Sequence, residues 1–161
     1  MKLYNRTKVE DTLMALIMKT AAKAAKVRRT GQVLVQINNG QRGLSGEASG
    51  TVRWVKIGGY GREIKCQGWL RVVFPLRGFN HPSFDKLQLA EKFWAVCVHE
   101  WAHIADSQNG LRFGSYNKRW AERPHEARAC YAAKYASANR STEAEQAILD
   151  LALLFSNEGC N

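Results

Sequence analysis

The first half of the chain changes once from a helical to an extended hydrophobic pattern. Apolar side chains recur at helical spacing between residues 8 and 29 and predict a helix, for which Gly31 supplies a stop signal. Segments rich in β-branched and aromatic residues then predict three strands, at 32–37, 51–57 and 63–74. The turn sequence GGYG at 58–61 indicates that the second and third strands form a hairpin.

Two further features of the extended half bear on the sheet. The glycine-rich segment 38–50 lacks the G-K-[ST] ending of a phosphate-binding loop, and we interpret it as a flexible connector. Pro75 ends the sequence WLRVVFP (69–75) and cannot donate to a strand ladder, so this segment is expected to form an edge strand.

The second half of the chain is helical in pattern. A long, largely apolar helix is predicted at 86–108, with Gly110 as its stop signal. A second helix is predicted at 124–138, where Pro124 suits the first position, and a third begins near Thr142. The order of elements predicts one α+β domain spanning residues 1–161, with a three-stranded, mainly antiparallel sheet.

The charge of the chain is distributed unevenly. The net charge is +10, and residues 1–77 hold 15 Lys and Arg against 4 Asp and Glu, whereas residues 78–161 hold 9 against 10. Lys19, Lys23 and Lys26 form a basic stripe on the first predicted helix. The basic N-terminal half therefore suggests nucleic acid as a partner, and a solvated surface that aids solubility is the alternative.

Nothing in the sequence predicts export or a membrane span. The apolar run LMALIM (13–18) follows Glu10 and Asp11 and ends at Lys19, which makes it too short and too charged for a signal peptide. No apolar run reaches the roughly 18 to 20 residues that a membrane helix needs. We therefore expect a cytoplasmic protein without a membrane partner. Its widely spaced cysteines are expected to be reduced and form no zinc ribbon; they are Cys66, Cys97, Cys130 and Cys160.

The motif with the clearest chemistry is VHEWAHIAD, residues 98–106. His99 and His103 are four residues apart, so a helix aims both imidazoles at one ion, with Glu100 about 60° around from His103. A zinc ion lowers the pKa of a bound water toward about 7, and Glu100 is placed to take the proton as general base. Two hydrogen-bonded core histidines are the alternative.

A catalytic zinc needs a third protein ligand. The motif version with a third histidine six residues after the second fails, because that position is Asn109. The candidates downstream are Glu122, His125 and Glu126, of which Glu126 is favoured because it falls in the first turn of the next helix, on a face of small residues. Its alternative role is to complement the helix dipole. Cys130, one turn further, is expected to be a buried thiol rather than a ligand.

Several other residues are candidates for supporting roles. Asp106 is three residues after the second histidine and either orients a ligand histidine or lies on the surface. Tyr116, Arg123 and His125 are candidates for stabilising an oxyanion, and no spacing selects among them.

The two motifs together carry a family resemblance. HEWAH followed by EARACYAAKYA (126–136) resembles the E-x-x-A-x-x-F-A-A pattern of ImmA/IrrE-like peptidases, which are HExxH zinc metallopeptidases (zincins) of the gluzincin type. This resemblance covers about residues 90 to 136. It implies a zincin-like minimal metalloprotease fold, one zinc ion held by His99, His103 and Glu126, and Glu100 as general base.

A looser resemblance concerns the arrangement of a helix and strands ahead of the motif. It is similar to that of SprT-like proteins, which are DNA-associated proteases. Those proteins typically use a third histidine and often a Cys-rich zinc module, neither of which this chain has. In zincins generally an edge strand ahead of the active helix binds extended substrate, and residues 69–75 are the segment expected to do so by strand addition.

The leading hypothesis from the sequence is a zinc-dependent hydrolase, an endopeptidase acting on a protein or peptide substrate. One alternative is a zincin-fold protein that binds nucleic acid or a partner with little or no hydrolysis. Another is zinc-dependent hydrolysis of a non-peptide amide, because the water-activating chemistry is shared.

Overall fold

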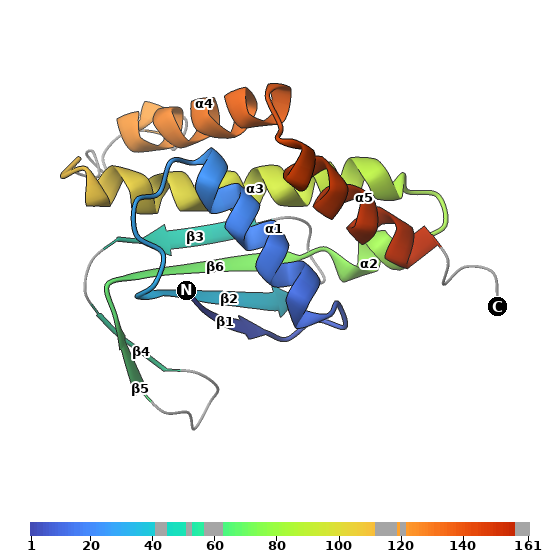
Figure 1. The fold of residues 1–161 in the computed structure, drawn as a ribbon, viewed down its shortest axis with the longest axis horizontal. Helices are drawn as coiled ribbons and strands as arrows, with labels where there is room; N and C mark the ends of the chain where they lie inside the picture. The colour runs from blue at the N-terminus through green and yellow to red at the C-terminus, as the bar shows by residue number, and fades with distance from the viewer. Residues whose placement is uncertain (41–44, 51–52, 57–62, 112–118, 120–121, 157–161) are drawn as a thin grey trace.

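In the computed structural model the chain combines helices with one mixed sheet and a separate two-stranded sheet (Figure 1). The structure describes residues 1–40, 45–50, 53–56, 63–111, 119 and 122–156. The elements, in chain order, are β1 (Lys2–Asn5), α1 (Asp11–Ala24), β2 (Val33–Asn39), β3 (Ser45–Ser49), β4 (Arg53–Lys56), β5 (Glu63–Cys66), β6 (Gly68–Phe74), α2 (Leu76–Asn80), α3 (Lys86–Gln108), α4 (Pro124–Ala138) and α5 (Thr142–Ser156). The predicted α+β class is confirmed.

The larger sheet has four strands in the order β1-β2-β6-β3. β1 pairs with β2 and β2 pairs with β6 in parallel, and only β3 runs antiparallel to β6. Parallel neighbours need a crossover, which α1 supplies between β1 and β2. The expected three-stranded, mainly antiparallel sheet is therefore wrong. The sequence pattern missed β1, whose four residues gain their place by pairing with a strand about 30 residues away.

The structure also changes which strand lies at the edge. β6 has β2 on one side and β3 on the other, so the expected edge strand at 69–75 is wrong. Pro75 follows the last paired residue, Phe74, and its missing N–H therefore breaks no ladder bond. The edge strand next to β6 is β3, which lies inside the segment 38–50 that was expected to be a flexible connector, and β1 forms the opposite edge.

The predicted hairpin is confirmed, with different boundaries. β4 and β5 pair antiparallel, from Arg53 opposite Cys66 to Lys56 opposite Glu63. The turn at 58–61 lies outside the described residues. The third predicted strand is interrupted at Gln67, and its two parts, β5 and β6, belong to different sheets.

Helix α1 is shorter than its hydrophobic pattern. It ends at Ala24 because Lys26 takes a left-handed conformation with φ of 60°, and the Val27 N–H then bonds to the carbonyl of Ala22 at 3.0 Å. This closure satisfies carbonyl groups at the end of the helix, as in a Schellman turn. The helix therefore stops well before Gly31.

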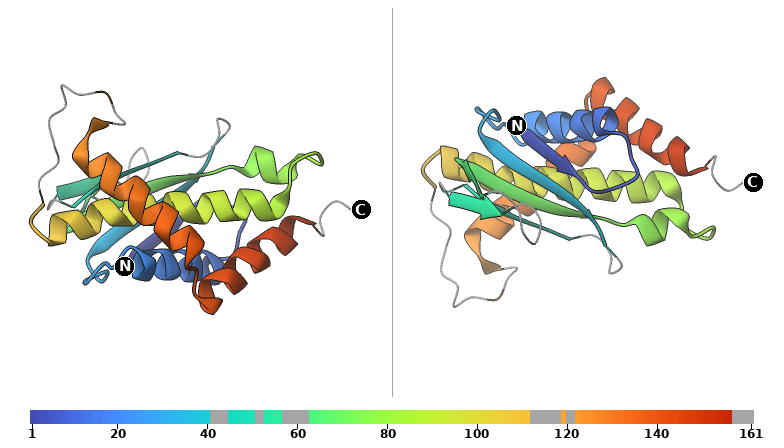
Figure 2. Two further views of the ribbon diagram at one scale, coloured as in Figure 1. Left: turned by 90° about the horizontal axis from the view of Figure 1, so that it is seen from above. Right: turned by 90° about the horizontal axis from the view of Figure 1, so that it is seen from below.

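The helices lie on one face of the larger sheet and meet in an aromatic core. α1 and α3 lie over the sheet, α4 lies on the outer side of α3, and α5 packs against α1 and α3 (Figure 2). Phe74, Phe79, Phe93 and Phe155 bring β6, α2, α3 and α5 together, with ring centroids 4.7–5.7 Å apart. The short helix α2 was not predicted, and its buried Phe79 explains why it folds onto this core.

A buried hydrogen bond also joins two of these helices. The indole N–H of Trp94 on α3 donates to the hydroxyl of Thr20 on α1 at 3.0 Å. None of the helices that the structure describes is both long enough and apolar enough to cross a bilayer.

Candidate metal centre

Helix α3 carries the HExxH residues in its C-terminal half, at the bounds that the sequence predicted. The carboxylate of Asp85 caps the start of the helix by accepting from the Gln88 N–H at 3.1 Å, and Gly110 follows its end with φ of 74°. His103 is only 5% exposed and His99 is half-buried. Both imidazoles lie on the face of α3 that α4 covers.

Helix α4 brings a carboxylate to these two histidines. Pro124 occupies the first turn, where its missing N–H has no helical partner to lose, and Glu126 follows in the same turn. Glu126 Oε2 lies 3.1 Å from His99 Nε2 and 3.4 Å from His103 Nε2. The two Nε2 atoms are 3.2 Å apart. Among the described residues these three side chains form one group that could hold a metal ion.

The spacing of the three atoms fits a tetrahedral zinc ion. Zinc bonds of about 2.0–2.1 Å at tetrahedral angles place any two ligand atoms about 3.3–3.4 Å apart. The three measured separations, 3.1, 3.2 and 3.4 Å, lie close to that value. Two imidazole nitrogens and one carboxylate oxygen are also a donor set that zinc prefers. The residues therefore fit the group that the sequence led us to expect.

The histidines are held in the protonation state that binds metal. Burial lowers the pKa of His103 to about 4, and the neighbouring His99 adds to the effect. Burial also lowers the pKa of His99, against the opposing influence of Glu126. Both rings are therefore neutral at pH 7, and a neutral imidazole has the free nitrogen lone pair that a metal needs.

Glu100 lies beside the three-atom group in a tight environment. Its side chain is 5% exposed, and burial, followed by the charges of Glu126 and Glu47, raises its pKa to about 8. A nearby bound cation would oppose this shift, because positive charge stabilises the carboxylate form. A carboxyl group with a pKa near neutrality is suited to accept and return a proton.

The close approach of β3 to Glu100 depends on a glycine. A Cβ atom built on Gly46 would lie 2.5 Å from the Cγ of Glu100 and 2.6 Å from its Oε1. Sequence reasoning missed both this glycine and Glu47, because SGEAS has no β-branched or aromatic residues to predict a strand. Gly46 is therefore the residue that lets the edge strand lie against the carboxylate of Glu100.

His125 supports the carboxylate of Glu126 from the opposite side. It is buried, and its Nε2 lies 3.3 Å from Glu126 Oε1, so the second oxygen, Oε2, is left facing the two motif histidines. Cys130 is exposed rather than buried, and its Sγ lies 3.8 Å from Nδ1 of His99. The expectation of a buried thiol at this position is wrong, because Cys130 is exposed to solvent although it lies one turn beyond Glu126.

The remaining candidates lie in different surroundings. Glu122 is exposed and lies outside the group of three residues that could hold a metal ion. Asp106 accepts from Arg128 Nε at 2.7 Å, which ties the end of α3 to α4. Arg123 is half-buried at the cap position of α4. Tyr116 lies outside the described residues, so the structure does not place this oxyanion candidate.

Comparison of the chain with protein-family models, with curated proteins and with solved structures finds no match.

Proposed function

We propose that this protein is a zinc-dependent metallopeptidase with a zincin-like, gluzincin-type site. His99, His103 and Glu126 hold one zinc ion per chain, and Glu100 is the general base for hydrolysis of a peptide bond. When bound, zinc supplies Lewis acidity that lowers the pKa of a water molecule and polarises a carbonyl group.

The observation that carries this proposal is the triangle of His99 Nε2, His103 Nε2 and Glu126 Oε2, with sides of 3.1 to 3.4 Å. If both neutral rings donate to the carboxylate through Nε2, the two nitrogens face each other as donors at 3.2 Å. A single cation between the three atoms satisfies all of them at once.

The other residues of the site divide the work of hydrolysis. Glu100 takes a proton from the attacking water and passes it to the departing amine, and its raised pKa suits both transfers. His125 holds the Glu126 carboxylate in one orientation. Packing of Gly46 against Glu100 keeps the base from moving away from the site.

The edge strand supports a polypeptide substrate. Within the described part of the chain, β3 has β6 as a partner on one side and ends the sheet on the other. An extended peptide can pair with that free edge through backbone hydrogen bonds. Because Gly46 of β3 packs against Glu100, such a peptide would pass beside the proposed base. This favours peptide hydrolysis over hydrolysis of a small non-peptide amide.

The first experiment measures bound metal. After dialysis, the wild-type protein should contain about one zinc ion per chain by plasma mass spectrometry. Glu126→Gln should lose most of it, whereas Glu122→Gln, the same change at an exposed residue four positions earlier, should retain it. Full zinc content in the Glu126 variant would end the assignment of that ligand.

The second experiment measures hydrolysis with a peptide library read by mass spectrometry. Glu100→Gln should keep its zinc and cleave at least about 100-fold more slowly than the wild type. Wild-type cleavage rates in this variant would rule out Glu100 as the base. A zinc-loaded wild type that cleaves no peptide would favour the alternative of a binding protein with little hydrolysis.

A further inference from the structure

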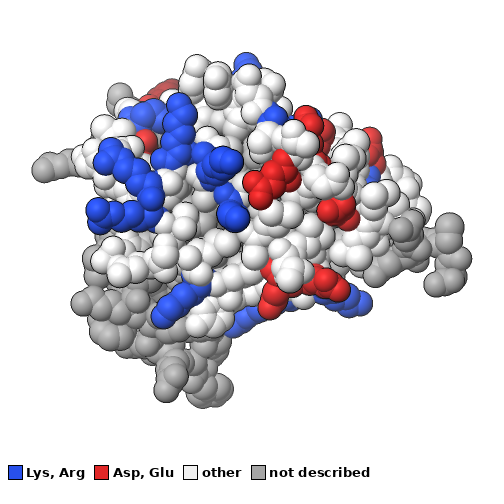
Figure 3. Space-filling model, in the orientation of Figure 1, with Lys and Arg blue, Asp and Glu red and all other residues white. Residues whose placement is uncertain are grey.

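A surface of exposed positive charge lies at the C-terminal end of α1 and on the segment that leads to β2. Figure 3 shows Lys and Arg side chains gathered on this side of the molecule. We define the basic patch by its five exposed residues, Lys19, Lys23, Lys26, Arg28 and Arg29. No Asp or Glu occurs in the sequence between Asp11 and Glu47, so the patch contains no acidic residue of its own segment.

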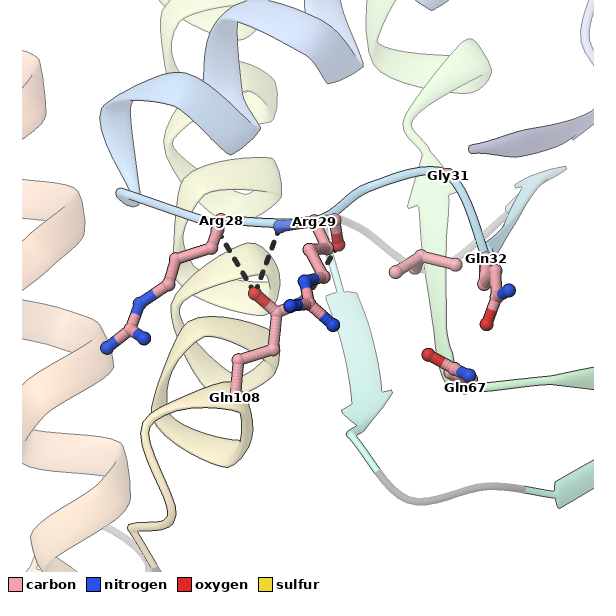
Figure 4. Close-up of a pocket in the computed structure, with 7 residues that line it drawn as sticks. Arg28, Arg29, Gly31, Gln32, Gln67 and Gln108 are labelled. Carbon is pink, nitrogen blue, oxygen red and sulfur yellow. Dashed lines mark hydrogen bonds between the residues drawn. The ribbon is translucent and has the colours of Figure 1, made fainter.

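A hollow of about 710 Å³ adjoins the basic patch. Arg28 and Arg29 line it together with the side-chain amides of Gln32, Gln67 and Gln108. In Figure 4, Arg29 extends toward the side on which Gln32 and Gln67 lie, and Arg28 extends the other way. The hollow therefore combines positive charge with groups that donate and accept hydrogen bonds, a combination that suits phosphate oxygens.

The arginine segment is held in place by the last residues of α3. Gln108 Oε1 accepts from the backbone N–H groups of Arg28 and Arg29 at 3.0 and 3.2 Å, and its Nε2 donates to the Arg29 carbonyl at 2.7 Å. The Arg28 guanidinium donates to Asn109. Within the described part of the chain, no carboxylate pairs with Arg29. Its charge is thus presented on an ordered backbone.

The surroundings of the basic patch distinguish among anionic partners. The exposed large hydrophobic side chains of the described residues all come from residue 84 onward, so none lies on α1 or on the segment between α1 and β2, which carry the patch. Insertion into a membrane and stacking on single-stranded bases both call for such side chains. Backbone contacts to a duplex need charge and hydrogen-bond donors alone.

We propose that the basic patch and its adjoining hollow bind double-stranded nucleic acid through the phosphate backbone. This proposal does not rest on the metallopeptidase proposal. Lys19 and Lys23 are four residues apart and span about 6 Å along α1, the axial rise of about two base pairs. Five phosphate contacts correspond to a slope of about −4.5 in a plot of log affinity against log salt concentration.

The test measures binding of a fluorescent 20-base-pair DNA duplex by anisotropy, at several salt concentrations. Lys23→Gln with Arg29→Gln should reduce the steepness of the salt slope by about 1.8 and weaken binding about 10- to 60-fold at 0.1 M salt. Lys92→Gln with Lys134→Gln removes the same charge from exposed positions elsewhere and should change the slope little. Circular dichroism checks that both variants are folded.

Three results would overturn the proposal: an equal loss of binding in the two double variants, tighter binding of the single strand than of the duplex, or binding to phosphatidylserine vesicles but not to the duplex. A duplex RNA of the same length is measured as well. Equal binding of both duplexes indicates recognition of the phosphates alone, and preference for DNA indicates recognition of its helical form; binding to either duplex supports the proposal. The Glu100→Gln protein should bind as the wild type does, which separates this proposal from that of hydrolysis.

Discussion

Replacing Gly46 with alanine tests the contact between β3 and the buried carboxylate of Glu100. The added methyl group would lie 2.5 Å from the Cγ and 2.7 Å from the Cδ of Glu100. Carbon atoms in contact are ordinarily about 3.5–4.0 Å apart, so the strand or the side chain must move by about 1 Å. Glu100 is 5% exposed and has little room to move, so part of the shift falls on the proposed base.

The size of the effect differs between stability and catalysis. Overpacking of a buried contact costs about 1–3 kcal/mol of unfolding free energy. A displacement of about 1 Å in a catalytic group reduces the rate by about 100-fold. The zinc content should stay at the wild-type level, because the three atoms nearest to the added methyl group all belong to Glu100 and none to His99, His103 or Glu126.

Three measurements on one preparation check this prediction: urea unfolding for stability, plasma mass spectrometry for zinc, and cleavage of the best library peptide for rate. Gly31→Ala is the matched control, because a Cβ at that exposed glycine meets nothing within 4 Å. The control variant should match the wild type in metal content and rate.

The reasoning is refuted if Gly46→Ala unfolds at the wild-type urea concentration and cleaves within about twofold of the wild-type rate. That outcome would mean that β3 does not lie against Glu100. If Gly46→Ala is less stable but the wild type itself cleaves no peptide, the placement of β3 against Glu100 is supported and the peptidase proposal is rejected. The stability measurement thus stands apart from the assignment of function.

Three further predictions concern the metal-free protein, the support of the ligand and the helix contact. Without metal, Glu100 should lower the stability by about 1.6 kcal/mol between pH 6.5 and 8, because its pKa is raised to about 8 and the folded protein keeps the proton after the unfolded chain has lost it. Unfolding with a chelator present, compared with Glu100→Gln, measures this contribution. His125→Asn should lower zinc affinity about 10- to 100-fold in a chelator competition, because Glu126 loses its positioning contact. Thr20→Val should cost about 1–3 kcal/mol in urea unfolding, since it leaves the Trp94 indole N–H buried without its acceptor.

Each of these predictions has a control within the chain. Glu100→Gln should remove the decline in stability above pH 6.5, and a decline that persists would assign it to another group. The exposed His81 and Thr12 allow the same substitutions as His125 and Thr20. Equal effects at the exposed and the buried positions would contradict the structural roles given to the buried ones.

The helices were predictable because their determinants are local. α3 and α4 lie at the predicted residues, since the 3.6-residue period, the proline at the start of α4 and Gly110 after α3 act within a turn or two of the backbone. The sheet was predicted less well, because the strands that pair with one another are far apart in the sequence. β6 has the composition of a strand, but nothing in WLRVVFP shows that it has a partner on each side.

By itself, the sequence determined that His99 and His103 share one helical face with Glu100 next to them, because that arrangement follows from residues four apart on one helix. For the third position it favoured Glu126 over Glu122 and His125 but could not place any of the three. The packing of α4 on α3 does that, by bringing Glu126 Oε2 within 3.4 Å of both imidazoles.

The tertiary structure also decided which strand lies beside the base. A five-residue segment without β-branched or aromatic side chains becomes β3, because it pairs with β6 and because its glycine has no side chain to keep it from α3. This contact depends on the missing Cβ of Gly46 and on Glu100, which lies more than 50 positions away in the sequence. Local patterns carry no information at that range, and for this reason the free edge of the sheet was visible only in the folded chain.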